Sequence, residues 1–536
     1  MIRLSQERTK TLLAIHGWSG ILLGLLLYAV ILTGMIAVFA DEIGDWSSPS
    51  QQQQPLAFPV GLDAKLRELA ATVDPQYFEE LSLFPRAGGR IQAFFHRHVI
   101  PEGSTQPEEQ GVQFTLHPQS LEVLARREGF WHDIEAFDLH NALADFLVKV
   151  HVSLHIPDPW GLLVTGILGL AMMVAATTGF IVHRHLLKEL FTIRRVREAL
   201  LARRDAHVVA ASWSLPFAFV LAFTGSFYSF ATSVGVPAMA TVAFGGDQVA
   251  LFETIVGLPP AENKARTPPA NLDAMIADAR GRTQTEPAFA AISHYGRADS
   301  QVTLFSYPSE GQLFNRNLVY SAASGAFVRE KPGLGLVPSI GGAAADLMGP
   351  LHFGNFAGVL SKGVWFVLGF TLCYVTLTGL LLWTTRRAES PVWHRMEHVV
   401  SWMGYGLPFS LALVPHSYFI GRAAGAVELE SPLAFTFLSG ALAVTATALV
   451  LRDPTKVRRW LLAATGFALV LLPFVRLLAE GPGWLEALQS TRITVLALDL
   501  GVLFGGALCI RSALRAQRTS RGHRAIDTED QSELTA

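Results

Sequence analysis

Long apolar segments separated by polar ones dominate the pattern of this chain. A helix needs about 20 predominantly apolar residues to cross the roughly 30 Å hydrocarbon core of a membrane. Eight segments approach or exceed that length, the seventh being short: residues 11–40, 160–182, 206–246, 363–385, 399–421, 432–451, 460–475 and 493–510. The pattern therefore predicts an integral membrane protein, mainly α-helical, with about eight transmembrane helices.

Two long segments between the spans carry a different pattern. They contain alternating apolar and polar runs such as GVQFTLHP and SQVTLFSYP, which are typical of half-buried strands. We therefore expect two α+β domains outside the membrane. The expected organisation is a first transmembrane helix at 1–40, an outer domain with a helix before the second span at 41–159, the second span at 160–184, a basic cytoplasmic loop at 185–206, the third span at 207–232, a second outer domain at 233–350, the fourth span at 351–386, a C-terminal extension of four transmembrane helices at 387–513 and a cytoplasmic tail at 514–536.

Basic residues mark one side of the membrane. Lys and Arg cluster before the first span and after every even-numbered span, and short loops rich in these residues stay in the cytoplasm. Both termini are therefore expected in the cytoplasm, with the two outer domains on the opposite side.

Composition narrows the class of protein further. Half of the 536 residues are hydrophobic, only 16% are charged and the net charge is −2, which argues against a soluble enzyme and against a nucleic-acid partner. Cys373 and Cys509 both lie in apolar segments and suggest neither a disulfide framework nor a metal site. The Cys-x-x-Cys-His motif is absent from the sequence, which excludes the usual covalent attachment of haem.

The spans and the outer domains repeat. A histidine precedes a Thr-Gly pair at matched spacing in the two halves: by 17 residues for His16 and Thr33, by 17 for His207 and Thr224, by 27 for His151 and Thr178, and by 26 for His352 and Thr378. Leu-Asp-Ala opens both outer domains, at Leu62 and at Leu272. A unit of span, outer domain and span therefore occurs twice, and such repeats place shared sites at the interface of the halves.

The four repeated histidines are candidate haem ligands. His16 and His207 lie at the cytoplasmic ends of their spans, whereas His151 and His352 lie near the outer ends. Two imidazoles on facing helices ligate a planar haem from both sides. About two b-type haems are therefore expected, one near each membrane face, with one of these two histidine pairs on each haem iron.

The first half offers two alternatives to His151 as a ligand, namely His155 and His140. His155 follows four residues later and shares a face with His151 if the segment is helical. The choice between His151 and His155 stays open at this point.

Three runs resemble spans of a known family. They are HGWSGILLGLLLYAVILTG, HVSLHIPDPWGLLVTGILGLAMMVAATTGF and LHFGNFAGVLSKGVWFVLGFTLCYVTLTGLLLW, and they resemble the PepSY-associated transmembrane helix family over roughly residues 10–390. This family includes inner-membrane reductases of ferric siderophores from Gram-negative bacteria, with four core spans, PepSY-like periplasmic domains and bound haem. The resemblance implies a haem-dependent reductase in the bacterial inner membrane, with axial ligands at His16, His151, His207 and His352.

The expected function is transmembrane electron transfer. Electrons enter the haem on the cytoplasmic side, pass to the outer haem and reduce a ferric siderophore or another ferric chelate in the periplasm. Fe(II) is released because hard oxygen ligands hold the lower charge less tightly. Without a convincing Gly-rich dinucleotide fingerprint, the electron donor is expected to be a quinol or a separate reductase, and no catalytic acid or base is assigned.

Two other classes of function stay open. One is a transporter or permease for a siderophore or a metal, because eight spans, a duplicated unit and an intramembrane Asp499 suit such a protein. The other is a PepSY-type regulatory or binding membrane protein without redox activity.

The remaining polar residues of the C-terminal spans are interpreted as structural. His394 and His398 are expected at the surface, and His416 is expected to be a hydrogen-bonded buried histidine rather than part of a quinol site. Arg476 is predicted to pair with Asp499. The outer segments show no Cys or His cluster with the usual spacing of metal ligands.

Overall fold

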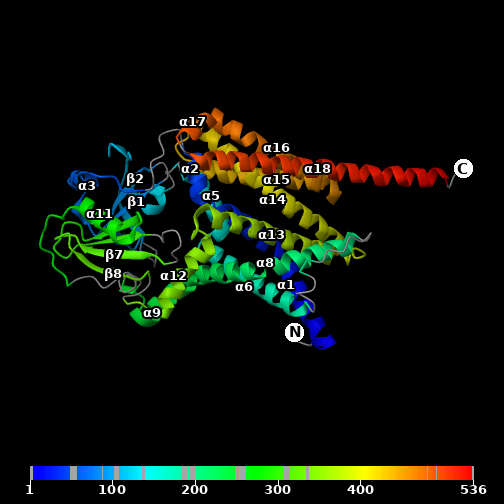
Figure 1. Ribbon diagram of the computed structural model, residues 1–536, viewed down its shortest axis with the longest axis horizontal. Coiled ribbons are helices and arrows are strands. Elements are labelled where there is room, and N and C mark those ends of the chain that lie inside the picture. Colours follow the sequence, from blue (N-terminus) through cyan, green and yellow to red (C-terminus); the bar gives the residue numbers. More distant parts are fainter. Residues whose placement is uncertain are drawn as a thin grey trace. The chain divides into compact units, whose positions relative to one another are not determined.

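The computed structural model divides into two compact units (Figure 1). The helical unit contains residues 1–50, 141–223 and 366–536, and the sheet unit contains residues 51–140 and 224–365. The structure describes residues 4–48, 57–86, 89–101, 108–135, 139, 141–183, 190–191, 199–247, 250–251, 261–306, 314–333, 337–479, 481–490 and 492–533, the last of these without side chains from residue 517.

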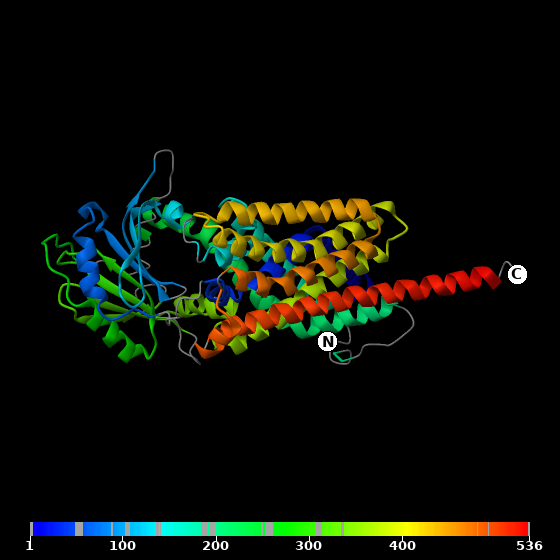
Figure 2. The ribbon, with the colours of Figure 1, turned by 90° about the horizontal axis from the view of Figure 1, so that it is seen from above.

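Long helices make up the helical unit, and they run alongside one another in Figure 2. The start of α1 and the end of α18 lie toward the same end of this unit (Figures 1 and 2). The helices are α1 (Gln6–Ala37), α2 (Ala40–Ser47), α5 (Ala142–Ser153), α6 (Trp160–Val182), α8 (Ala199–Phe230), α13 (Gly358–Thr385), α14 (Pro391–Ala423), α15 (Glu430–Leu451), α16 (Pro454–Leu478), α17 (Trp484–Gln489) and α18 (Ile493–Glu533), of which α8 and α13 continue into the sheet unit.

Seven helices of the described chain are long and apolar enough to cross a membrane, as expected of an integral membrane protein. They correspond to seven of the eight predicted spans. The exception is the predicted span at 399–421, which lies within α14. Polar side chains such as Ser401, Ser410 and His416 lower the apolar content of that segment, although α14 still packs along α15 and α16. By length and composition, seven of the about eight predicted spans are therefore found among the described residues, and α14 occupies the position of the other one.

Two short helices precede the second and fourth spans and end in equivalent turns. α5 carries His151 in its last turn, and Leu154 beyond it adopts a left-handed conformation with φ 55°. α12 (Ile340–Phe353) carries His352 in its last turn and ends at Gly354 with φ 65°. The predicted span at 351–386 is thus broken at Gly354, where a Cβ atom would lie 2.6 Å from the ring of Trp365.

The strands of both predicted outer domains form a single antiparallel sheet. Its order is β4-β3-β2-β1-β5-β6-β7-β8, so two four-stranded halves join where β1 pairs with β5. This pairing leaves neither inner edge exposed. The strands are β1 (Glu80–Pro85), β2 (Ile91–Val99), β3 (Glu108–Leu116), β4 (Val123–Phe130), β5 (Pro287–Ser293), β6 (Gln301–Ser306), β7 (Arg316–Ser321) and β8 (Phe327–Lys331).

Two equivalent helices, α3 (Leu62–Ala70) and α11 (Leu272–Thr283), contribute to the core of the sheet unit. Leu66 and Ile276 of these helices are buried in one hydrophobic cluster with Leu83, Phe95 and Leu304 of the strands. Burying apolar side chains from both sequence repeats in one cluster stabilises the sheet unit as a whole. This unit also contains α4 (Trp131–Glu135), α9 (Val236–Phe244) and α12.

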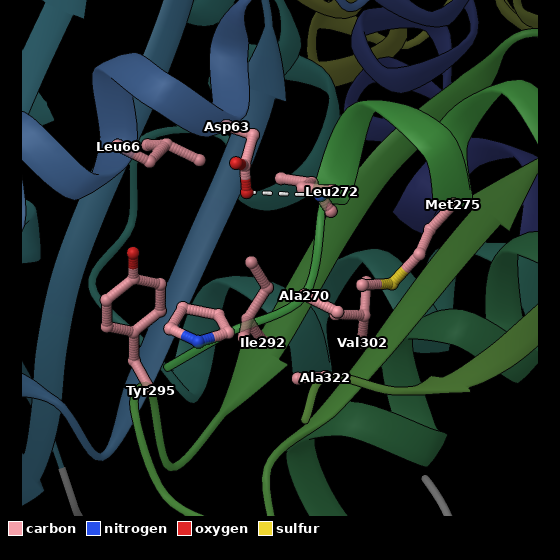
Figure 3. Close-up of a pocket in the computed structure, with 10 residues that line it drawn as sticks. Asp63, Leu66, Ala270, Leu272, Met275, Ile292, Tyr295, Val302 and Ala322 are labelled. Carbon is pink, nitrogen blue, oxygen red and sulfur yellow. Dashed lines mark hydrogen bonds between the residues drawn. The ribbon is translucent and has the colours of Figure 1, made fainter. Parts of the chain in front are cut away.

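The repeated Leu-Asp-Ala motif has a structural explanation. Asp63 accepts a hydrogen bond from the backbone N–H of Leu272 at 3.1 Å, as Figure 3 shows. Asp273 accepts one from the backbone N–H of Gly61 at 3.0 Å. Each aspartate therefore binds the N-terminus of the other repeat's helix, where free N–H groups favour a negative charge.

The pocket drawn in Figure 3 lies beside this pair of helix ends. Its lining is mainly apolar and includes Leu66, Met275, Ile292 and Val302. It has room for about one water molecule. It is therefore part of the packed core of the sheet unit and is too small to hold a chelate.

The C-terminal helices are held by a buried ion pair that confirms the predicted contact. Arg476 donates to Asp499 through Nε at 3.2 Å and through Nη2 at 2.6 Å. The indole N–H groups of Trp46 and Trp484 also donate to this carboxylate, at 2.8 and 2.7 Å. Because Trp46 belongs to α2, this carboxylate ties the N-terminal part of the chain to α16 and α18.

We predict that Asp499→Ala destabilises the protein by about 3–5 kcal/mol, because it leaves the Arg476 guanidinium buried without its partner. The matched control is Lys149→Gln, which removes an ion pair between half-exposed side chains on α5 and α15 and should cost no more than about 1 kcal/mol. The measurement is the thermal unfolding of both variants in detergent. Equal midpoints for the two variants would contradict the structural role of Asp499.

Candidate functional site

The imidazole of His16 on α1 is held by the neighbouring span α6. Its Nδ1–H donates to the backbone carbonyl of Ala175 at 2.9 Å. The hydroxyl oxygen of Thr178, three residues later, lies 3.4 Å from the same nitrogen. Thr178 begins the Thr-Gly pair that the sequence shows near the end of the second span, so this pair binds a histidine from another helix.

The other three repeated histidines are held in the same way. His151 Nδ1 lies 2.9 Å from the carbonyl oxygen of Val30, three residues before Thr33. His207 Nδ1 lies 3.0 Å from the carbonyl oxygen of Val375, three residues before Thr378, and 3.1 Å from the Thr378 hydroxyl. His352 Nδ1 lies 2.9 Å from the hydroxyl of Thr224. Each half of the chain therefore uses both of its own Thr-Gly pairs to hold both of its own histidines.

These contacts fix which ring nitrogen carries the proton. A carbonyl oxygen only accepts hydrogen bonds, and the hydroxyls of Thr33, Thr178 and Thr378 donate to the carbonyls four residues before them in their own helices. In His16, His151 and His207, Nδ1 therefore carries the proton, and Nε2 keeps its lone pair. Burial lowers the pKa of His151, although the hydrogen bond to Val30 opposes this shift. The imidazole is therefore neutral at pH 7.

The glycine of each Thr-Gly pair makes room for the ring. A Cβ atom at Gly34 would lie 2.6 Å from Cε1 of His151. At Gly179, Gly225 and Gly379 it would lie 3.2 Å from Cε1 of His16, His352 and His207, respectively. A side chain at position 34 would therefore displace the imidazole, and alanine at the other three positions would be tighter than ordinary van der Waals contact.

The two sites of the first half lie at opposite ends of one helix. His16 and Thr33 are 17 residues apart on α1, which corresponds to about 26 Å along the helix axis. This span is close to the roughly 30 Å thickness of the hydrocarbon core. His16 and the imidazole held beside Thr33 are thus separated along α1 by nearly the thickness of that core.

Within the helical unit, His16 and His207 also lie near each other. The two side chains, on α1 and α8, are close enough to interact electrostatically. The two imidazoles come from different sequence repeats, as the predicted pairing on the cytoplasmic side requires.

The alternative ligand candidates lie elsewhere. The ring of His155 packs against Phe146 in a tilted arrangement with 4.6 Å between ring centroids, and His155 adopts a left-handed conformation beyond the end of α5. His140 lies outside the described residues. His416 Nε2 donates to the carbonyl of Ala468 at 3.0 Å, which agrees with the expected structural histidine.

The sequence analysis did not identify one group of residues in the sheet unit. His96, His98 and Glu109 of the sheet unit come together as potential metal ligands, a grouping that the search for the usual ligand spacing did not identify. The missed signal is the spacing of two between the histidines, because alternate residues of a strand share one face.

Comparisons with known proteins agree with this architecture. A family model described as the PepSY-associated TM region matches residues 13–386. The match includes all four repeated histidines and all four Thr-Gly pairs, whereas α14 to α18 lie beyond it. An uncharacterized protein of Pseudomonas aeruginosa, PA4219, is 26% identical over 398 residues, which cover 70% of this chain and 95% of that protein.

We predict that Gly34→Ala destabilises the protein by about 1–3 kcal/mol, because the new methyl group overpacks the His151 ring. The control is Gly20→Ala on the same helix, where nothing lies within 4 Å of the added Cβ and where the better helix propensity of alanine adds up to about 1 kcal/mol. Thermal unfolding of each variant, alone and with His151→Ala, measures the coupling. A cost of Gly34→Ala that is unchanged without the imidazole would disprove this contact.

Proposed function

Because the chain belongs to the PepSY-associated TM family, we propose that its four repeated histidines hold two b-type haems and that the protein is a membrane reductase of ferric chelates. One observation carries this proposal. Three of the four imidazoles donate from Nδ1 to a backbone carbonyl of a neighbouring helix, and His352 Nδ1 is hydrogen-bonded to the Thr224 hydroxyl, so Nε2 of each ring is the nitrogen left to bind iron. Histidines that ligate metals in proteins almost always have their second nitrogen bound in this way.

The residues present fit such a cofactor. Neutral imidazoles are the form that ligates haem iron, and each ring is fixed by a hydrogen bond and by a glycine that admits it closely. We assign His16 and His207 to one haem, supported by their proximity in the helical unit. We assign His151 and His352 to the other because they occupy equivalent positions in the two repeats. His155 is not chosen, since it packs against Phe146 instead of contacting a Thr-Gly pair.

When bound, haem supplies a one-electron carrier within an insulating bilayer. The chain's own part is to orient the ligands, to bury the rings and to separate the two sites along α1 by nearly the thickness of the membrane. A ferric siderophore or another ferric chelate is the proposed acceptor, because reduction to Fe(II) weakens its hold on hard oxygen ligands. A quinol or a separate reductase is the proposed donor.

The proposed location is the bacterial inner membrane, with both termini in the cytoplasm and the sheet unit in the periplasm. Basic residues at the N-terminus and after α6, α13, α15 and α18 support this orientation. The beginning of α1 and the end of α18 at one end of the helical unit agree with it. Against transport through Asp499, that carboxylate already accepts hydrogen bonds from Arg476, Trp46 and Trp484.

We predict that the purified protein binds about two b-type haems per chain and that His16→Ala and His352→Ala each remove about half of the absorbance. His151→Ala should behave in the same way, while His155→Ala and His416→Ala should keep both haems. The measurement is the dithionite-reduced spectrum with haem quantified against protein. A colourless protein purified with full haem supply would reject the proposal, and loss of haem in His155→Ala would reject the ligand assignment.

We also predict that the reduced protein donates electrons to a ferric chelate. Anaerobic mixing of the dithionite-reduced, desalted protein with a ferric hydroxamate should reoxidise the haem bands and release Fe(II), trapped by a chromogenic ferrous chelator. The His352→Ala variant should slow this reaction at least about tenfold, since the outer ligand pair is lost. A wild-type protein that holds haem but reduces no ferric chelate would point to another electron acceptor.

A further inference from the structure

We propose that His96, His98 and Glu109 of the sheet unit form a binding site for a first-row divalent transition-metal ion. One ligand atom from each residue lies within 4.8 Å of the other two. Two imidazole nitrogens and one carboxylate suit Zn(II), Fe(II) or Mn(II), whereas Mg(II) and Ca(II) prefer oxygen ligands alone. These residues are separate from the four repeated histidines, so the proposal does not rest on the proposed haem function.

Strand register brings the three side chains together. His96 and His98 alternate on β2, so they share the face opposite the one on which Phe95 joins the hydrophobic core. Glu109 of β3 is the direct cross-strand partner of His98, and Gly111 is the partner of His96. A Cβ atom at Gly111 would lie 2.8 Å from Cβ of His96. Glycine at this position therefore lets β3 approach the base of the His96 side chain closely.

His98 is oriented as a metal ligand would be. Its Nδ1–H donates to Glu79 at 2.8 Å, which leaves Nε2 with a lone pair. Nε2 lies 4.0 Å from the nearer carboxylate oxygen of Glu109. That separation is too long for a hydrogen bond, and a shift of about 0.6 Å would bring the two atoms to the roughly 3.4 Å that separates two ligands of a tetrahedral ion. A carboxylate bound to the far nitrogen of a ligating histidine is a common support of metal sites.

His96 supplies the second, independent observation. Its side chain is buried, with 1% of its surface exposed, and its Nε2 lies 3.1 Å from the hydroxyl of Ser82. Its Nδ1 is also buried and has no hydrogen-bond partner among the described residues. A buried polar atom without a partner is costly, and a bound metal ion would remove that cost.

The charge state of His96 suits this role. Burial, with a smaller contribution from the neighbouring His98, lowers the pKa of His96 to about 3. The imidazole is therefore neutral at pH 7, which is the form that binds metal. Glu80, the cross-strand partner of His96 on β1, adds a further carboxylate beside the cluster.

The test is a Co(II) titration of the full-length protein, purified without a polyhistidine tag and stripped with a chelator. We expect about one equivalent to bind saturably, with loss of that binding in His96→Ala. Glu109→Gln changes a side chain that is 42% exposed and should weaken the affinity at least tenfold without unfolding the sheet. Glu79→Gln should weaken it about 10–100-fold through the orientation of His98.

The control is His132→Ala, which removes an exposed imidazole of α4 in the same unit and should leave the affinity unchanged. Thermal midpoints show whether each variant is folded. A wild-type protein that binds no more Co(II) than His96→Ala, or a folded Glu109→Gln with wild-type affinity, would overturn the proposal. Haem content separates the two hypotheses, because a colourless protein that binds Co(II) rejects only the reductase, and a haem protein that binds none rejects only the metal site.

Discussion

The hydrogen bond from a histidine Nδ1 to a neighbouring span is the interaction on which the helical architecture depends. An imidazole inside a membrane is unfavourable unless its polar atoms are satisfied. Here the carbonyl three residues before a threonine meets that need for His16, His151 and His207. The following glycine admits the ring. Helix pairing and histidine orientation therefore come from the same few atoms.

This arrangement connects the two ends of each sequence repeat. In the first half, α1 presents His16 to α6 and receives His151 from α5. The exchange connects α1 with both α5 and α6 through these hydrogen bonds. The buried Asp499 carboxylate adds a second connection, since Trp46 on α2 and Arg476 on α16 meet on it. The helices beyond the family match are thereby attached to the N-terminal part of the chain.

Much of the fold could be predicted from the sequence, because hydrophobic length and repeat spacing are local signals. They gave the spans, the duplicated unit, the Arg476–Asp499 pair and the positions of the four histidines. The binding of each imidazole to a Thr-Gly pair was not predictable, because it depends on which helices are neighbours. His151 and His155 look alike in sequence, and only the left-handed turn after α5 separates them.

Long-range strand pairing explains the other differences. Nothing in the sequences of β1 and β5 shows that they pair across some 200 residues, so two outer domains were expected where one sheet is found. The cluster of His96, His98 and Glu109 likewise depends on the register between β2 and β3. The predicted span at 399–421 is not among the seven helices that are apolar enough to cross a membrane. Polar residues are scattered along α14 and lower its apolar content.

The pairing of β1 with β5 has a consequence for the symmetry of the sheet unit. A polypeptide with one copy of the repeat would carry an unpaired edge at β1, and an identical polypeptide would present the same edge in the opposite direction. The reciprocal contacts of Asp63 and Asp273 have the same two-fold relation. Within the sheet unit, the two repeats thus have the relation that two identical subunits have across a two-fold axis, with the β1–β5 pair at the centre.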